Sequence, residues 1–186
     1  MKKTVLIFGF ISGAIMAGFL FTTVLFIKNV GFDNAMIVGY TGMVLAFMLV
    51  FFGVRSYREN VAGGRISFGR AFAVGICIML ISSACYVVAW EIVYFNFMHD
   101  FADKYAAHVV EQVRKSGAGE QAVQAKLQEM KSFKELYENP FFNAAVTFVE
   151  PLPPGLLMTL ISALILRKKG RAGELDSDLS VTQAAS

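Results

Sequence analysis

Four long stretches of apolar residues, separated by polar segments, dominate the chain. They span 4–27, 35–54, 71–95 and 141–166, and the only charged residues within them are Glu91 and Glu150. Each stretch has about 20 residues or more, the helical length needed to cross roughly 30 Å of hydrocarbon. The pattern predicts an all-α fold, a bundle of four transmembrane helices. The first stretch is longer than the apolar core of a signal peptide, so we expect it to be retained as a membrane helix.

The segment 99–140, between the third and fourth stretches, has a different pattern. Apolar residues recur every four positions from Phe97 to Val113, with charged residues between them. This spacing is typical of an amphipathic helix, and we expect the third transmembrane helix to continue beyond the membrane. Gly117 is predicted to end it, because glycine readily adopts the left-handed conformation of a helix C-terminus.

A second amphipathic helix is predicted after Gly117, with Val123, Leu127 and Met130 on its apolar face. Ser132 and Glu135 have the spacing of a capping box, which predicts that a further short helix starts there. The insertion 99–140 is therefore interpreted as an external amphipathic helical hairpin whose apolar faces meet.

The fourth stretch contains Pro151, Pro153 and Pro154 directly after Glu150. Proline removes a backbone donor and clashes with the preceding turn, so we expect this helix to kink or break near residue 150. We interpret 1–171 as a single membrane domain and 172–186 as a disordered polar tail.

The charged residues predict how the chain is threaded through the membrane. The segment from Arg55 to Arg70 carries four arginines and one acid and reads as a loop between two apolar stretches. Such loops remain cytoplasmic, which places both termini in the cytoplasm as well. Ser67 is predicted to cap the third helix. The net charge of +3 is small, and these basic residues are interpreted as lipid head-group anchors rather than nucleic-acid contacts.

The motif around this loop resembles a known family. Val-Arg-Ser-Tyr-Arg-Glu-Asn at 54–60 is followed by Gly-Gly-Arg-Ile-Ser-Phe-Gly-Arg-Ala-Phe at 63–72, and then by Tyr86 and Trp90. This pattern is similar to that of the bacterial membrane family catalogued as domain of unknown function 4199, over roughly 3–169. The resemblance implies a four-helix protein of the bacterial inner membrane. It implies no catalytic residue and no cofactor.

Glu91 and Glu150 are the first candidate site, because an ionisable residue within a membrane segment suggests function. Both are expected towards the outer ends of their helices. Two carboxylates that share a site of low dielectric constant could bind a cation or a proton. The alternative is that both reach interfacial water or accept hydrogen bonds from Asn96, Tyr94 or Asn143.

His99 and Asp103 are the second candidate site. If the third helix continues through them, their spacing of four residues places them on one helix face, as a metal site requires. The alternative is surface hydrogen bonding, with Asp100 capping a helix. Cys77 and Cys85 lie eight residues apart in one helix, about 12 Å, and are expected to be free thiols.

Two functions remain open on the sequence alone. The first is a non-enzymatic structural or accessory membrane protein, either homo-oligomeric or bound to an external partner through 99–140. The alternative is a small ion- or proton-coupled carrier that uses Glu91, Glu150 and the proline break. The chain lacks the common motifs of hydrolases and cofactor-binding proteins, so we expect no enzymatic activity and no cofactor.

Overall fold

The computed structural model describes residues 1–168, with the side chains of that range except those of 26–30, 32 and 33. Its helices are α1 (Lys2–Asn60), α2 (Phe68–Phe97), α3 (Phe101–Lys115), α4 (Glu120–Tyr137), α5 (Pro140–Val149) and α6 (Leu152–Leu166). The predicted tail, 172–186, lies outside the described residues.

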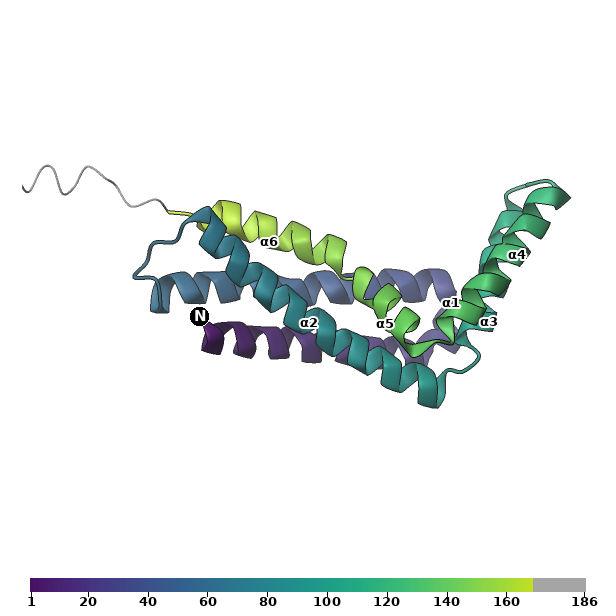
Figure 1. Cartoon of the computed structure of the whole chain (residues 1–186), viewed down its shortest axis with the longest axis horizontal. Helices are drawn as coiled ribbons and strands as arrows, with labels where there is room; N and C mark the ends of the chain where they lie inside the picture. The colour runs from purple at the N-terminus through teal and green to yellow at the C-terminus, as the bar shows by residue number, and fades with distance from the viewer. Residues whose placement is uncertain (169–186) are drawn as a thin grey trace, which may run out of the picture.

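Within residues 1–168, four segments are long and apolar enough to cross a membrane, namely Lys2–Leu25, Asn34–Asn60, Phe68–Phe97 and Pro140–Leu166. They lie side by side, and α3 and α4 project from one end of the bundle (Figure 1). The predicted all-α bundle with a helical hairpin between the third and fourth spans is confirmed. We call the end that holds α3 and α4 the hairpin end, and the end with the N-terminus and Lys168 the basic end.

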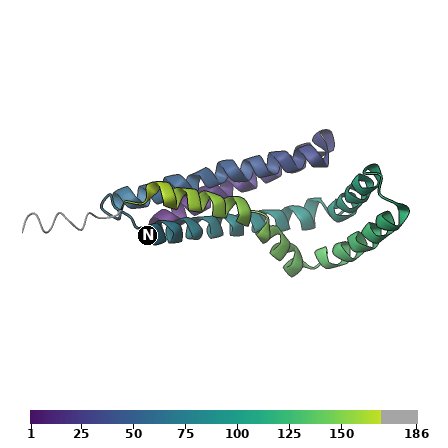
Figure 2. The ribbon, with the colours of Figure 1, turned by 90° about the horizontal axis from the view of Figure 1, so that it is seen from above.

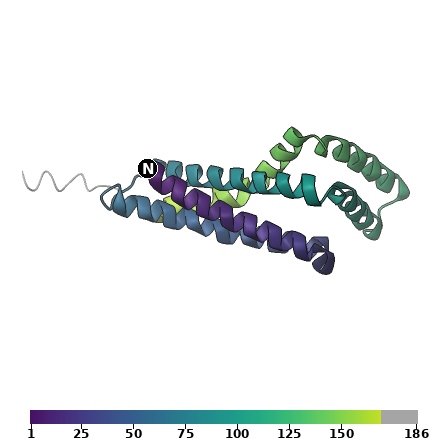
Figure 3. The same ribbon diagram turned by 90° about the horizontal axis from the view of Figure 1, so that it is seen from below.

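Helix α1 reverses direction at Gly31 and forms two antiparallel arms, Lys2–Leu25 and Asn34–Asn60 (Figures 2 and 3). The φ of 75° at Gly31 costs glycine little but would strain other residues. Small residues let the arms approach closely. A Cβ added to Gly42 would lie 2.6 Å from the Phe19 ring, and the Ser12 hydroxyl donates to the Ala46 carbonyl at 2.9 Å.

The predicted arginine loop is shorter than expected, because the second arm of α1 continues to Asn60. Arg55 Nε donates to Glu59 Oε1 at 3.0 Å, one helical turn further on. Arg58 Nη1 donates to the Leu166 carbonyl at 3.4 Å, near the end of α6. These contacts give the charged residues partners on or beside the helix, which explains why the arginine-rich sequence remains helical.

The remaining loop, 61–67, ties three helices together at the basic end. The Ser67 hydroxyl accepts a hydrogen bond from the Arg70 backbone N–H at 3.4 Å, so the predicted N-cap of this helix is confirmed. Ile66 is buried, and its carbonyl accepts from the Lys168 backbone N–H at 3.0 Å. The family-like motif therefore has a structural role, which is to join the second arm of α1, α2 and the end of α6.

The third membrane helix does not continue into the insertion as predicted. Helix α2 ends at Phe97, and a short turn leads to α3 at Phe101. Phe101 packs edge-on against Trp90, with ring centroids 4.9 Å apart, and Met98 is buried in the turn. The apolar spacing was correct for each helix, but the chain turns after Phe97, so that α3 leaves the end of α2 in a new direction and packs against α4 (Figure 1).

Helices α3 and α4 form the predicted hairpin. Gly117 has a φ of 78°, which confirms its left-handed conformation. Val123 and Met130 are buried as predicted, whereas Leu127 is exposed and was wrongly placed on the apolar face. The predicted restart at Ser132 is also wrong, since α4 runs unbroken to Tyr137. Its last turns carry Phe133 and Tyr137, whose rings stack 5.1 Å apart and extend the apolar face.

The predicted helix break near residue 150 is confirmed, because α5 ends at Val149 and α6 begins at Leu152. The two pieces have different neighbours. Helix α6 packs against α1 and α2, whereas α5 packs against α2 and α4. Close contacts fix α6, since a Cβ on Gly75 would lie 2.8 Å from Thr159. The break therefore turns α5 away from α1 at the hairpin end.

Candidate ligand-binding site

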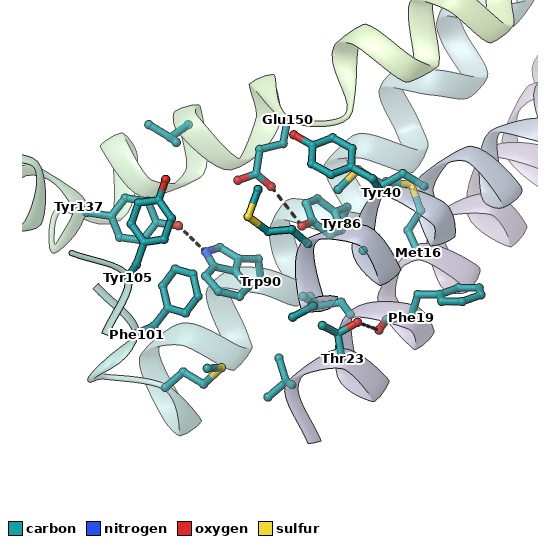
Figure 4. A pocket seen from close by; sticks show the side chains of 18 of the residues that line it. Met16, Phe19, Thr23, Tyr40, Tyr86, Trp90, Phe101, Tyr105, Tyr137 and Glu150 are labelled. Carbon is teal, nitrogen blue, oxygen red and sulfur yellow. Dashed lines mark hydrogen bonds between the residues drawn. The ribbon is translucent and has the colours of Figure 1, made fainter. Parts of the chain in front are cut away.

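A cavity of about 380 Å³ lies where α5 diverges from α1. It extends from Met16 and Met43, on the two arms of α1, to Tyr105 and Phe133 in the hairpin. Helix α2 contributes Tyr86 and Trp90, and Glu150, the residue after α5, lines the cavity opposite them (Figure 4). Its size falls within the range of small-molecule sites, about 300–1,000 Å³.

Glu150 places a carboxylate in the otherwise mainly apolar and aromatic wall of this cavity. Its Oε2 accepts a hydrogen bond from the Tyr86 hydroxyl at 3.2 Å, and Tyr40 is drawn beside the pair in Figure 4. Glu150 sits at the junction of α5 and α6, and its side chain reaches Tyr86 on α2. The break thus places an ionisable group at the cavity rather than in the lipid.

A network of hydrogen bonds around Trp90 joins the cavity to the hairpin. Trp90 Nε1 donates to the Tyr137 hydroxyl at 2.9 Å and to Asn143 Oδ1 at 3.0 Å. Asn143 is fully buried, and it also accepts from Thr147 Oγ1 and donates to the Tyr137 carbonyl, both at 3.3 Å. Burial raises the pKa of the Tyr137 phenol above its usual range, so the hydroxyl stays neutral. The network fixes Trp90 against α4 and α5.

Aromatic rings continue this network into the hairpin. Tyr94 meets Tyr137 edge-on at 5.3 Å between ring centroids, and Phe133 meets Phe142 at 6.4 Å. Aromatic pairs in such geometries contribute about 0.5–1.5 kcal/mol beyond the area they bury. The hairpin is therefore packed onto the bundle, and its rings form the outer wall of the cavity.

Glu91 does not join Glu150 at this site. It is not among the residues that line the cavity, and its Oε1 is buried without a hydrogen-bond partner within the described part of the chain. Glu91 follows Trp90 by one position, about 100° around the helix, so the two side chains leave α2 in different directions. The cavity therefore holds one carboxylate of the predicted pair.

His99 and Asp103 do not share a helix face as the sequence suggested. His99 lies in the turn before α3, whereas Asp103 is inside α3. Asp103 Oδ1 accepts a hydrogen bond from Lys134 Nζ at 2.6 Å, which raises the pKa of Lys134. Among residues 1–168, no group of three or more His, Cys, Asp or Glu side chains is placed to hold a metal.

Residues 7–168 match the model of the family described as a protein of unknown function, DUF4199. The chain belongs to this family. No curated protein and no solved structure matches the chain. Membership confirms the resemblance carried by the loop motif, and together with the four apolar spans it indicates an integral, multi-pass membrane protein.

Sequence reasoning missed Tyr86 and Trp90 as parts of the site, although both belong to the family-like motif. Their spacing of four residues places them on one face of α2, a signal that was available. It also missed the partners of Glu150 and Asn143. The expected donors to the glutamates were Asn96, Tyr94 and Asn143, whereas Glu150 is bonded to Tyr86 and Asn143 to Trp90.

Proposed function

We propose that this member of the family is a non-enzymatic membrane protein that binds a small, largely apolar molecule in the cavity at the hairpin end. The observation that carries the proposal is the cavity itself, which contains Glu150 and Tyr86 and has the hairpin as its outer wall. In this view the hairpin acts as the cap of a binding site.

The absence of enzymatic activity is part of the proposal. The reactive groups available in the cavity wall are the Glu150 carboxylate and hydroxyl groups; the carboxylate is bonded to the Tyr86 hydroxyl, and the Tyr137 hydroxyl to Trp90 Nε1. His99 and His108 are outside the wall. This composition suits binding and orientation of a ligand better than proton transfer coupled to bond cleavage.

We also propose a location in a bacterial inner membrane with both termini in the cytoplasm. Its support is the set of basic residues at the basic end: Lys2 and Lys3 begin α1, Arg58 is bonded to the end of α6, and Arg65 lies in the loop that is bonded to Lys168. Basic residues near membrane boundaries favour the cytoplasmic side. The hairpin then faces the periplasm, where an external partner or a second copy could bind it.

The test uses purified protein in detergent and a panel of small amphiphiles that are cationic, neutral or anionic. A ligand that binds the folded state raises the melting temperature by mass action. Gly39 lines the cavity, and a Cβ added there would meet nothing within 4 Å. Gly39→Phe should therefore fill the cavity without disrupting the helix.

Gly18→Phe is the matched control, because Gly18 is an equally open helical position of α1 outside the cavity. At least one amphiphile should raise the melting temperature of the wild type and of Gly18→Phe, but not that of Gly39→Phe. The proposal fails if no compound does so, or if the shift persists in Gly39→Phe.

A second function, a small ion- or proton-coupled carrier, is favoured by the helix break beside Glu150. Broken helices free backbone carbonyls, which some transporters use to bind cations. The separation of Glu91 from the cavity leaves such a site with one carboxylate. Flux of protons or common cations into liposomes, abolished by Glu150→Gln and retained by Glu91→Gln, would support this function. Flux equal to that of empty liposomes would end it.

A further inference from the structure

The described wall of the cavity contains an acidic residue but no basic residue. Glu150 is an acid, and none of the described residues that line the cavity is Lys, Arg or His. The hydrogen bond to Glu150 comes from Tyr86, a neutral donor. An anionic ligand would be repelled by this carboxylate, and a neutral ligand would bring no charge to compensate it.

Aromatic side chains surround the same space. Tyr40 comes from α1, Tyr86 and Trp90 from α2, and Phe101 and Tyr105 from α3. The faces of such rings attract a cation that lies within about 6 Å of the ring centroid, most strongly for tryptophan. Cages of this kind are effective for ammonium groups that carry bulky substituents, because these groups are weakly hydrated.

The dimensions of the cavity argue against a bare metal ion as the ligand. A volume of about 380 Å³ is far larger than an ion, and its wall is mostly apolar. Hard divalent cations require roughly six oxygen ligands, whereas Glu150 is the only carboxylate among the described lining residues. An organic cation satisfies the carboxylate with its charge and fills the remaining volume with its apolar part.

We propose that the cavity binds a lipophilic organic cation, a quaternary or protonated amine with an apolar substituent, with its charge between Glu150 and the aromatic rings of Tyr86 and Trp90. This inference rests on the proposed binding function and specifies its ligand class. The apolar substituent extends towards Met16 and Met43, on the α1 side of the cavity.

The experiment uses the emission of Trp90, because it is the single tryptophan of the chain and lines the cavity. The purified full chain is titrated with benzyltrimethylammonium and with neopentylbenzene, which has the same shape without the charge. The cation should change the emission saturably and bind at least about tenfold more tightly than the neutral compound, which corresponds to one decade in Kd.

Two variants test whether Glu150 causes the tighter binding of the cation. Glu150→Gln keeps the shape of the side chain and should weaken binding of the cation about tenfold, with little effect on neopentylbenzene. Glu91→Gln is the matched control, since Glu91 lies on the same helix as Trp90 but outside the cavity, and it should bind like the wild type. If Glu150→Gln does not fold, the comparison of the two compounds in the wild type still decides the question.

The outcomes separate this inference from the function on which it rests. Equal binding of the two compounds, or cation binding that is the same in Glu150→Gln, overturns the ligand class but leaves a binding cavity that Gly39→Phe should still block. Lack of binding by every amphiphile, charged or neutral, overturns both proposals.

Discussion

The two ends of this bundle share α1 and α2 and are packed differently. Towards the basic end, Val50 and Val54 are fully buried, and a Cβ on Gly53 would lie 2.5 Å from Ile78. At the hairpin end the helices surround a cavity of about 380 Å³, and a Cβ on Gly39 would meet nothing within 4 Å. Close packing at one end holds the helices together while the other end remains open for a ligand.

The difference arises from where the small residues and the prolines lie. Helix association in membranes depends on close packing, and small residues permit it. Gly75 and Gly155 bring α2 and α6 into contact, with Met79 and Thr159 filling the space beside them. The break at Pro151 then redirects α5 towards α2 and α4, away from α1.

The strongest test of this contrast places the same large side chain at both ends. Gly75→Leu forces its side chain against Thr159 and Val50, and we expect a loss of stability of roughly 3 kcal/mol, because an overpacked core must shift. Gly39→Leu enters the cavity and should change stability little. Thermal unfolding of both variants in one detergent measures the difference, and equal losses would contradict the contrast.

A rescue experiment identifies the contact that destabilises variants with a side chain at position 75. A Cβ there would lie 2.8 Å from Thr159 Cγ2, and Thr159→Ala removes that atom. The double variant Gly75→Ala/Thr159→Ala should therefore be more stable than the sum of the single losses predicts, because contacting residues are not additive. Strict additivity would mean that another contact causes the loss.

At the hairpin end, hydrogen bonds around Asn143 add to the aromatic packing between the hairpin and the bundle. Asn143→Leu removes bonds to Trp90, Thr147 and the Tyr137 carbonyl. An intramolecular hydrogen bond contributes about 0.5–1.5 kcal/mol net, so the expected loss of stability for the three bonds is about 2 kcal/mol or more. Trp90 emission should shift as the hairpin loosens, whereas it should remain unchanged in Gly75→Ala. Unchanged stability and emission in Asn143→Leu would show that the network does not fix the hairpin.

The smallest expected effect concerns the ion pair between α3 and α4. The Asp103 carboxylate raises the pKa of Lys134, so this pair stabilises the hairpin fully below the usual lysine pKa, about 10.4, and the contribution is lost as pH rises through the raised value. Both groups are exposed, and the effect on the melting temperature should be near the limit of detection. Lys134→Met should remove this pH dependence of the melting temperature. If the melting temperature of Lys134→Met depends on pH as that of the wild type does, the dependence belongs to other groups.

The sequence predicted the spans, the hairpin and the helix break, because these follow from length, periodicity and proline chemistry within single segments. It misplaced the end of α2, because an apolar residue every four positions continues across Met98 into α3. It also paired Glu91 with Glu150. Depth along a helix can be estimated from residue spacing, but the face that meets a neighbour depends on tertiary packing. The cavity was not predictable for the same reason, since it forms where α5 leaves α1.

The most direct test compares two buried positions on the second arm of α1. Met43 lines the cavity, whereas Val50 lies two turns away in the packed region, and both are nearly inaccessible, at 6% and 0% exposure. Met43→Cys and Val50→Cys, each in a Cys77→Ala/Cys85→Ala background, are treated with a small thiol reagent. Modification should be at least about tenfold faster at 43, because the reagent reaches it without local unfolding. Equal rates would contradict an open hairpin end.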